Sequence, residues 1–237
     1  MKAPGRPARR KIPLEQIDFA VQSLDMNPNW AAENLQTIRT LMERSAVYRR
    51  ALAPIMFFSG AMGLVGAVAG WLFKLESSSA FVLLWLGVAA VATLGALLLV
   101  RRQALKDSEP FWSPPTRRVG QALLPAYFVG FTVAVLALIV ANQSSGHDGG
   151  LQIMLVVLWT WLYGCATHAA GFFMPRGVRW LGWIYVVAGT VLLVGMVFWE
   201  RILMHFPPHV FMGGIFGGLH LAYGIYLYFT EPKTPVA

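Results

Sequence analysis

Six apolar stretches, each about 20 residues long, constrain this chain more than any other feature of its sequence. An α-helix of that length crosses a hydrocarbon core of about 30 Å, because each residue adds about 1.5 Å. A helix also satisfies its own backbone hydrogen bonds, as lipid requires. Proline is tolerated in a first turn, so Pro54 is expected in the opening turn of the first helix. The stretches predict transmembrane helices at residues 52–73, 79–100, 119–141, 151–174, 178–199 and 209–229.

The composition agrees with a membrane protein. Only 13% of the residues are charged, and the mean hydropathy is +0.57, whereas about 25% of the residues of a soluble domain are charged. The sequence therefore predicts an all-α integral membrane protein, with a six-helix bundle over residues 51–230. It contains no nucleophile elbow, zinc-protease motif or P-loop, so we expect no enzymatic activity.

The basic residues are distributed unequally between the two sides of the predicted bundle. One side carries 17 of the 19 Lys and Arg residues, and the other carries Lys74 and Arg201. Because positive residues stay in the cytoplasm, both termini are predicted to be cytoplasmic. The net charge of +8 does not indicate nucleic-acid binding, since the basic clusters adjoin apolar stretches and are suited to anionic lipid head groups.

The segment before the first apolar stretch has two parts. Residues 1–29 predict a mobile basic tail, and residues 231–237 form a second, C-terminal tail. Residues 30–50 predict an amphipathic helix, either on the membrane surface or as a simple lead-in to the first span. If this helix binds a cytoplasmic protein, its polar residues Arg39, Glu43, Arg44 and Tyr48 are the candidate contacts.

Only two ionisable residues, His168 and His220, lie well inside the predicted spans. Ion-coupled carriers place carboxylates near the midplane, so their absence disfavours a pump. The two imidazoles could ligate haem b. Their depths argue against it, because they differ by roughly 9 Å along the membrane normal at 1.5 Å per residue. The alternative is that both are neutral and hydrogen-bonded to Thr, Tyr or backbone groups of other helices.

A second histidine pair flanks two prolines on the predicted outer side. His205 and His209 lie there, and His147 with Asp148 is in the neighbouring outer loop. Four such side chains could bind a metal ion. Their spacing matches no recognised ligand motif, so the alternative is a set of exposed histidines without metal.

Glycines are spaced for close helix packing in two spans. They are Gly60, Gly63, Gly66 and Gly70 in the first span, and Gly213, Gly214, Gly217 and Gly218 in the last. Small residues at this spacing let helix backbones approach. We expect packing within the bundle rather than a homo-oligomer interface, which is the alternative.

The stretch Ile38-Arg39-x2-Met42-Glu43-Arg44-Ser45, just before a Gly-rich first span, resembles a family of uncharacterised bacterial six-span membrane proteins. The pattern Phe216-Gly217-Gly218-Leu219-His220 in the last span is also similar to that family. The resemblance implies a bacterial inner-membrane protein. It further implies a regulatory pair with a soluble transcription regulator, because family members often occur beside winged-helix regulators.

Three functions remain open from the sequence. The first is a non-enzymatic regulatory or interaction module that contacts a partner through residues 30–50. The second is a cofactor-binding accessory subunit that uses His168 and His220. The third is a small-molecule or lipid permease, which would need an internal cavity.

Overall fold

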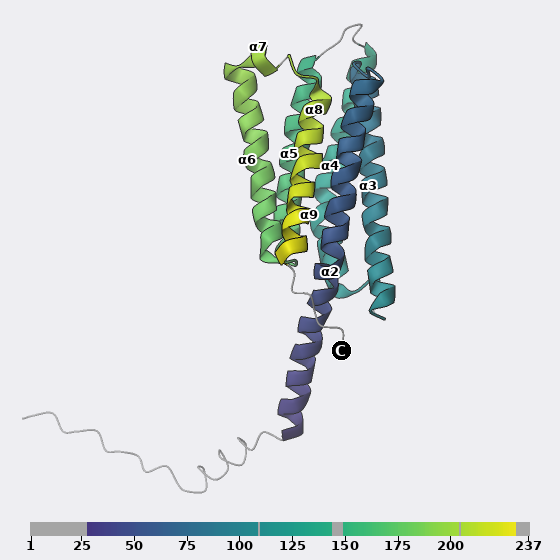
Figure 1. The fold of residues 1–237 in the computed structure, drawn as a ribbon, viewed down its shortest axis with the longest axis vertical. Coiled ribbons are helices and arrows are strands. Elements are labelled where there is room, and N and C mark those ends of the chain that lie inside the picture. Colours follow the sequence, from purple (N-terminus) through teal and green to yellow (C-terminus); the bar gives the residue numbers. More distant parts are fainter. Residues whose placement is uncertain (1–27, 109, 144–148, 204, 231–237) are drawn as a thin grey trace, which may run out of the picture. The chain divides into compact units, whose positions relative to one another are not determined.

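The computed structural model describes residues 28–108, 110–143, 149–203 and 205–230. The chain divides into two compact units, Met1–Arg44 and Ser45–Ala237. The second unit contains every candidate membrane span, and its helices are arranged side by side along a common direction (Figure 1).

The described residues form an all-α fold, as predicted. The long helices are α2 (Pro28–Leu72), α3 (Ser78–Lys106), α4 (Pro114–Gln143), α5 (Gly149–Ala170) and α6 (Arg176–Phe198). The last span is composite, with α8 (Pro208–Met212), the π-helix η1 (Gly213–Gly218) and α9 (Leu219–Thr230), and the short α7 (Glu200–Leu203) precedes it. Within the described residues, six helical segments are long and apolar enough to cross a membrane. The predicted number of spans is confirmed.

Three local expectations need correction. Pro54 lies in the interior of α2, not in an opening turn, because the helix already begins at Pro28 and continues through residue 50. The fourth span ends at Ala170 instead of residue 174, and Phe172 and Phe173 lie in the turn that follows. The last span is not a uniform α-helix, since it contains η1.

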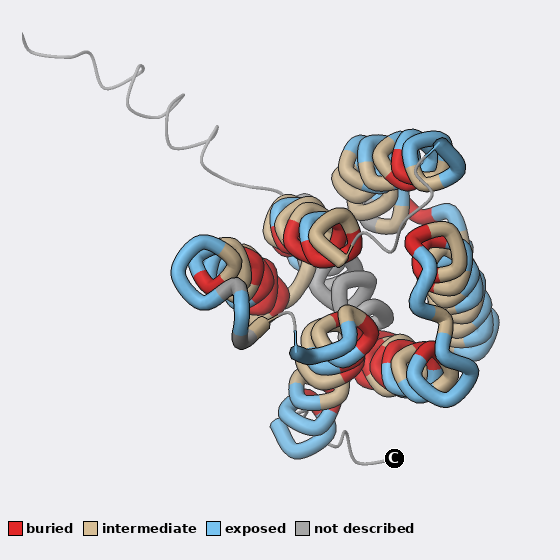
Figure 2. Tube along the Cα trace, turned by 90° about the horizontal axis from the view of Figure 1, so that it is seen from above, coloured by how far each residue is buried: buried red, intermediate tan, exposed pale blue. Residues whose placement is uncertain are grey.

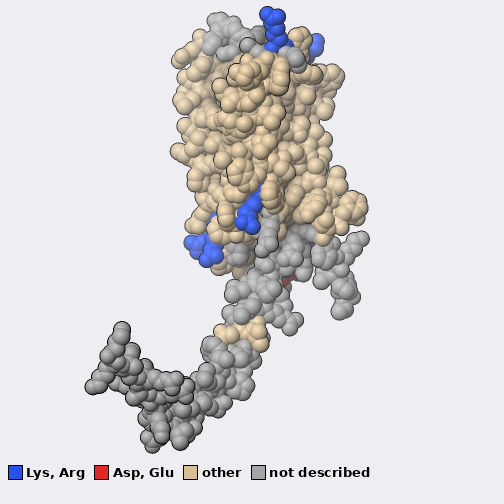
Figure 3. Space-filling model, turned by 90° about the vertical axis from the view of Figure 1, so that its left-hand side faces the viewer, with Lys and Arg blue, Asp and Glu red and all other residues tan. Residues whose placement is uncertain are grey.

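The bundle places apolar side chains on its outer surface. Buried residues face neighbouring helices, whereas exposed residues line the outer sides (Figure 2). The exposed residues include large apolar side chains such as Val68, Leu98, Phe131, Val187 and Phe229. A soluble protein does not expose apolar surface on this scale. Figure 3 shows Lys and Arg near the two ends of the face in view and none across its middle. The chain is a multi-pass membrane protein.

Helix α5 is the most enclosed span, and it is hydrogen-bonded to both neighbours through tryptophans. The indole N–H of Trp159 donates to the Gly130 carbonyl in α4, at 3.1 Å. The indole N–H of Trp161 donates to the Thr190 hydroxyl in α6, at 3.2 Å. Half of the apolar stretch of α5 is buried, against 11% of the corresponding stretches of α3 and α4. Helix α5 therefore forms the centre of the bundle.

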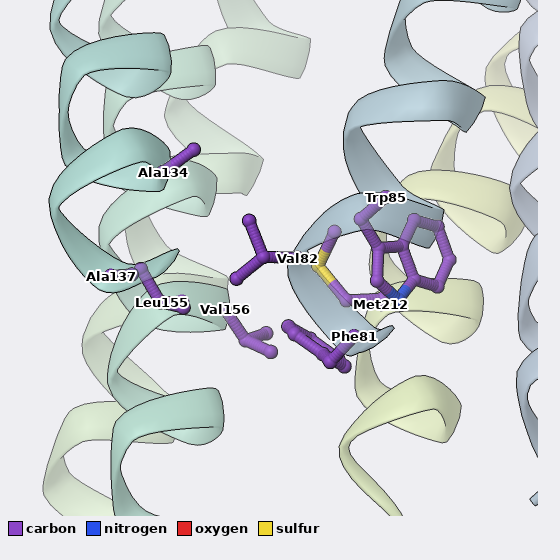
Figure 4. Close-up of a cluster of buried hydrophobic side chains, with 8 residues drawn as sticks. All are labelled: Phe81, Val82, Trp85, Ala134, Ala137, Leu155, Val156 and Met212. Atoms are coloured by element: carbon purple, nitrogen blue, oxygen red, sulfur yellow. The ribbon is translucent and has the colours of Figure 1, made fainter. Parts of the chain in front are cut away.

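Two apolar clusters fill the bundle. The first joins α3, α4, α5 and α8, and its buried members are Phe81, Val82, Trp85, Ala134, Ala137, Leu155, Val156 and Met212 (Figure 4). The second joins α2, α6 and α9, through Leu52, Ala53, Met56, Val178, Leu181, Tyr185 and Leu227. Ile215 and Phe216 of η1 pack against both clusters. The last span thus connects the two cores.

The glycines of α2 allow the last span to approach closely, as expected. A Cβ built at Gly63 would lie 2.8 Å from the backbone nitrogen of Gly217, and one built at Gly60 would lie 2.8 Å from that of Leu221. Real Cβ atoms do not come this close to backbone. Packing within the bundle is therefore confirmed for Gly60, Gly63 and Gly217, whereas Gly214 and Gly218 face open space.

Candidate functional site

His220 is the centre of a buried polar junction between α5, α6 and α9. Its Nε2 lies 2.7 Å from the hydroxyl of Tyr163 in α5, and its Nδ1 lies 2.7 Å from the hydroxyl of Tyr185 in α6. Nδ1 also contacts the carbonyl oxygen of Phe216. His220 is 4% exposed and Tyr185 is fully buried. We call Tyr163, Tyr185 and His220 the tyrosine–histidine junction.

The partners of His220 indicate where its proton lies. The Phe216 carbonyl only accepts hydrogen bonds, so Nδ1 carries the hydrogen and donates to it. The Tyr185 hydroxyl donates to the Ile215 carbonyl, at 3.4 Å, and its oxygen faces Nδ1. The six candidate spans contain no Asp or Glu to balance a positive ring, and an unpaired charge in a membrane is costly. We therefore assign a neutral ring, whose Nε2 accepts the Tyr163 hydroxyl hydrogen.

The π-helix η1 lies directly beside this junction. Its sequence is Gly-Gly-Ile-Phe-Gly-Gly, and four glycines permit the wider turn with little steric conflict. Its Ile215 and Phe216 carbonyls face the side chains of Tyr185 and His220. Side-chain donors thus supply hydrogen bonds to two backbone carbonyls of this π segment, and π segments are frequent at functional sites.

His209 forms a second buried contact, with α3 and with the turn after α2. The indole N–H of Trp85 donates to its Nδ1 at 3.1 Å, and its Nε2 lies 3.0 Å from the Leu75 carbonyl. The indole N–H only donates and the carbonyl only accepts. Nδ1 therefore has the lone pair and Nε2 has the hydrogen, so the ring is neutral. The ring lies against Gly70, where any Cβ would collide with it.

These contacts bear on the predicted metal ligands. His209 is 4% exposed, and both of its ring nitrogens are hydrogen-bonded within the protein. His205 is exposed, and its Nδ1 donates to the Arg201 carbonyl. Over the described ranges, no three or more His, Cys, Asp or Glu side chains are grouped to hold a metal ion. His147 and Asp148 lie outside those ranges, and metal binding by His205 and His209 stays a prediction.

His168 lies apart from His220. It is half-buried, its Nδ1 donates to the Arg179 carbonyl at 3.3 Å, and its ring packs edge-on against Phe172 and Trp183. His220 is level with Tyr163, which precedes His168 by five positions on α5. Those five residues correspond to about 7.5 Å of helix. The structure matches the alternative in which both histidines bond to tyrosine or backbone groups of other helices.

These positions do not fit a haem b held by His168 and His220. A bis-histidine haem needs two imidazoles that face one iron from opposite sides. Nε2 of His220 faces the Tyr163 hydroxyl instead, and its Nδ1 faces Tyr185 and Phe216. His168 contacts a different set of residues at a different level of the bundle.

The predicted partner-binding residues Arg39, Glu43, Arg44 and Tyr48 lie within α2. Their side chains are outside the described part of the structure. Most of the predicted tail 1–29 and all of the tail 231–237 are outside it as well.

Sequence reasoning did not identify three site residues, Tyr163, Tyr185 and Trp85. One signal was present, because a histidine deep in a span needs a hydrogen-bonding partner on a neighbouring helix. Tyr163 and Tyr185 are the single tyrosines of the fourth and fifth spans, so a search for such partners would have included them. Nothing comparable indicates Trp85, since nine tryptophans are spread along the chain.

Comparison with known proteins found no match to a protein-family model, to a curated protein or to a solved structure. The resemblance to the bacterial six-span family is therefore still a prediction from the sequence. The observations establish a multi-pass α-helical membrane protein with two buried histidine contacts, His209 and His220, that join its spans.

Proposed function

We propose that this membrane protein is a non-enzymatic regulatory or interaction module, whose N-terminal helical segment binds a soluble partner protein. The length of α2 carries the proposal. Helix α2 has 45 residues, and its candidate span, Ala51–Leu72, accounts for 22 of them. The turns before Ala51 are not needed to cross the bilayer, so they are available for binding. We propose Arg39, Glu43, Arg44 and Tyr48 as contact residues.

The interior of the bundle supports the same proposal. His168, His209 and His220 all form hydrogen bonds inside the protein, and the six candidate spans contain no Asp or Glu. Ion-coupled transport and acid–base catalysis both need an ionisable group that is free to exchange protons or ligands. A bundle whose polar groups bond to one another is better suited to hold a binding segment at the membrane.

The orientation is part of the proposal. Because the chain changes sides at each of the six candidate spans, 17 of the 19 Lys and Arg residues are assigned to the side of the N-terminal segment and 2 to the other side. By the positive-inside rule that side is cytoplasmic. A cytoplasmic partner can then reach residues 30–50.

Photo-cross-linking in the native host tests the proposal. A photoreactive phenylalanine analogue would replace Leu35, whose side chain is 66% exposed, or Tyr48 in the full chain. We expect one soluble protein to be captured from both positions, and to be lost in the Arg39→Glu/Arg44→Glu variant. The matched control replaces Leu105, 70% exposed at the end of α3, and there the analogue should not capture that protein.

Two results would overturn the proposal. The first is unchanged capture in the charge-reversal variant. The second is that every co-purifying protein stays bound after residues 1–50 are deleted. An absorption spectrum with a Soret band would support the cofactor-binding alternative instead.

A further inference from the structure

Two arginines from different helices lie against adjacent aromatic rings at one end of the bundle. The Cζ atom of Arg118 in α4 lies 6.0 Å from the centre of the Phe173 ring. The Cζ atom of Arg179 in α6 lies 5.2 Å from the centre of the Phe172 ring. Phe172 and Phe173 are consecutive residues in the turn between α5 and α6. Cation–π contact thus holds two guanidinium groups beside one turn.

The position of Arg179 is further fixed by its stem and backbone. A Cβ built at Gly171 would lie 2.5 Å from Cγ of Arg179, so the stem runs over the space that this glycine leaves. The Arg179 carbonyl accepts from Nδ1 of His168 at 3.3 Å. Because the side chain is held in place before any ligand arrives, less conformational entropy is lost on binding.

The positive charge here has no acidic counterpart among the described residues. No ion pair of Arg118 or Arg179 occurs there, and neither α4 nor α6 has an acidic residue in its first turn. Arg118 instead stands near the start of α4, where the helix dipole is already positive and acidic residues are preferred. A bound anion would therefore be favoured beside both arginines.

The depth of the two arginines identifies the kind of anion. Each is the third residue of its candidate span, Thr116–Gln143 or Gly177–Phe198, and a long arginine side chain at the end of a span reaches the level of the lipid head groups. Trp180, 71% exposed, and Trp112, 61% exposed, lie near the same ends of these helices, as expected of residues at a membrane interface. A position at the membrane interface therefore favours a lipid phosphate over a soluble anion.

We propose that Arg118, Arg179 and the Phe172–Phe173 turn form a binding site for the phosphate of an anionic phospholipid. The two guanidinium groups donate hydrogen bonds to phosphate oxygens, for which their planar geometry is suited. The acyl chains of the lipid lie along the apolar outer surface of the bundle. This site is independent of the proposed protein partner.

Native mass spectrometry of the full-length protein tests the site, with phosphatidylglycerol as the probe and phosphatidylcholine as the uncharged reference. We expect the first phosphatidylglycerol to bind about 30-fold more weakly to the Arg118→Gln/Arg179→Gln variant, at roughly 1 kcal/mol per arginine and 1.4 kcal/mol per tenfold change. Arg101→Gln/Arg102→Gln, which removes an exposed pair near the end of α3, should change binding less than threefold, since among the described residues no aromatic ring holds these side chains in place.

Two further measurements test the role of the aromatic rings and distinguish a lipid phosphate from free phosphate. Phe172→Leu with Phe173→Leu keeps both charges but removes the rings, and should weaken the first phosphatidylglycerol several-fold. Inorganic phosphate at millimolar concentration should not displace the lipid. If Arg179→Gln does not fold, Arg118→Gln alone, at an exposed position, should still weaken binding about fivefold. Equal weakening in the Arg101/Arg102 control, or no preference for phosphatidylglycerol over phosphatidylcholine, would overturn the proposal.

Discussion

The indole N–H of Trp85 donates to Nδ1 of His209, although the two residues are 124 positions apart in the chain. The bond joins the second span to the first turn of the last span. It also fixes the tautomer of the imidazole, whose Nε2–H donates to the Leu75 carbonyl. One histidine thus connects α3, α8 and the turn that follows α2.

Removing the indole donor should destabilise the protein. In Trp85→Phe the lone pair on Nδ1 of His209 loses its partner in a buried site, which costs about 1–3 kcal/mol. The thermal unfolding midpoint in detergent should fall by roughly 2–4 °C per kcal/mol for a chain of this length. Trp180→Phe, at an exposed position, should leave the midpoint nearly unchanged. Equal effects of the two substitutions would show that the bond does not contribute.

The two tyrosines of the junction should differ in importance. Tyr163→Phe leaves Nε2 of His220 without a donor and should cost about 1–3 kcal/mol. Tyr185→Phe should cost only about 0.5–1.5 kcal/mol, because Nδ1–H keeps the Phe216 carbonyl as its acceptor and the Ile215 carbonyl keeps the backbone N–H of Leu219 as its donor. Thermal midpoints measure both, with exposed Tyr228→Phe as the control. A larger cost for Tyr185→Phe would reverse the proton assignment of His220.

Alanine substitutions at neighbouring glycines of the last span should differ in their effect on stability. Gly217→Ala would place a Cβ 2.9 Å from the backbone nitrogen of Leu64, and this overpacking should cost about 1–3 kcal/mol. Gly214→Ala and Gly218→Ala meet open space and should change stability by no more than about 0.5 kcal/mol. Thermal midpoints at low protein concentration check this. Strong destabilisation by Gly214→Ala would mean that another chain covers that face.

Thiol labelling should establish the orientation of the bundle. Cys165→Ser removes the single native cysteine, and Glu76→Cys or Ser108→Cys then introduces one at opposite ends of α3. Because alternation of the six candidate spans assigns 17 of the 19 basic residues to the side of residue 108, we expect that side to be cytoplasmic. An impermeant maleimide should label residue 76 in spheroplasts, and residue 108 only after lysis. The reverse pattern would refute the predicted cytoplasmic termini.

The six spans could be predicted because their length is set by the bilayer and not by tertiary contacts. Each span is apolar over about 20 residues because it faces lipid, and this pattern is visible in a single sequence. The glycine stripe of α2 was equally readable, since close packing in lipid depends on small residues.

The burial of His209 could not be predicted in the same way. It follows two prolines at the start of a span, a position typical of an exposed interfacial residue. The His209 ring fits against the backbone of Gly70, where there is no side chain to exclude it, and it is hydrogen-bonded to Trp85 of another helix. Trp85 and His209 are 124 positions apart in the chain, so no local sequence pattern predicts their contact. The π-helix is similar, because a Gly-rich sequence permits several helical forms and no local pattern indicates which of them is adopted.

The contact between His209 and the Leu75 carbonyl has a consequence for how the protein is made. The two residues are 134 positions apart, and a ribosome adds about 5–20 residues per second. The glycine-lined side of the first span therefore waits on the order of ten seconds in the membrane before its own partner helix exists. During that interval insertion machinery, lipid or another nascent chain must cover it. Packing of this bundle is thus completed only when α8, η1 and α9 close against α2.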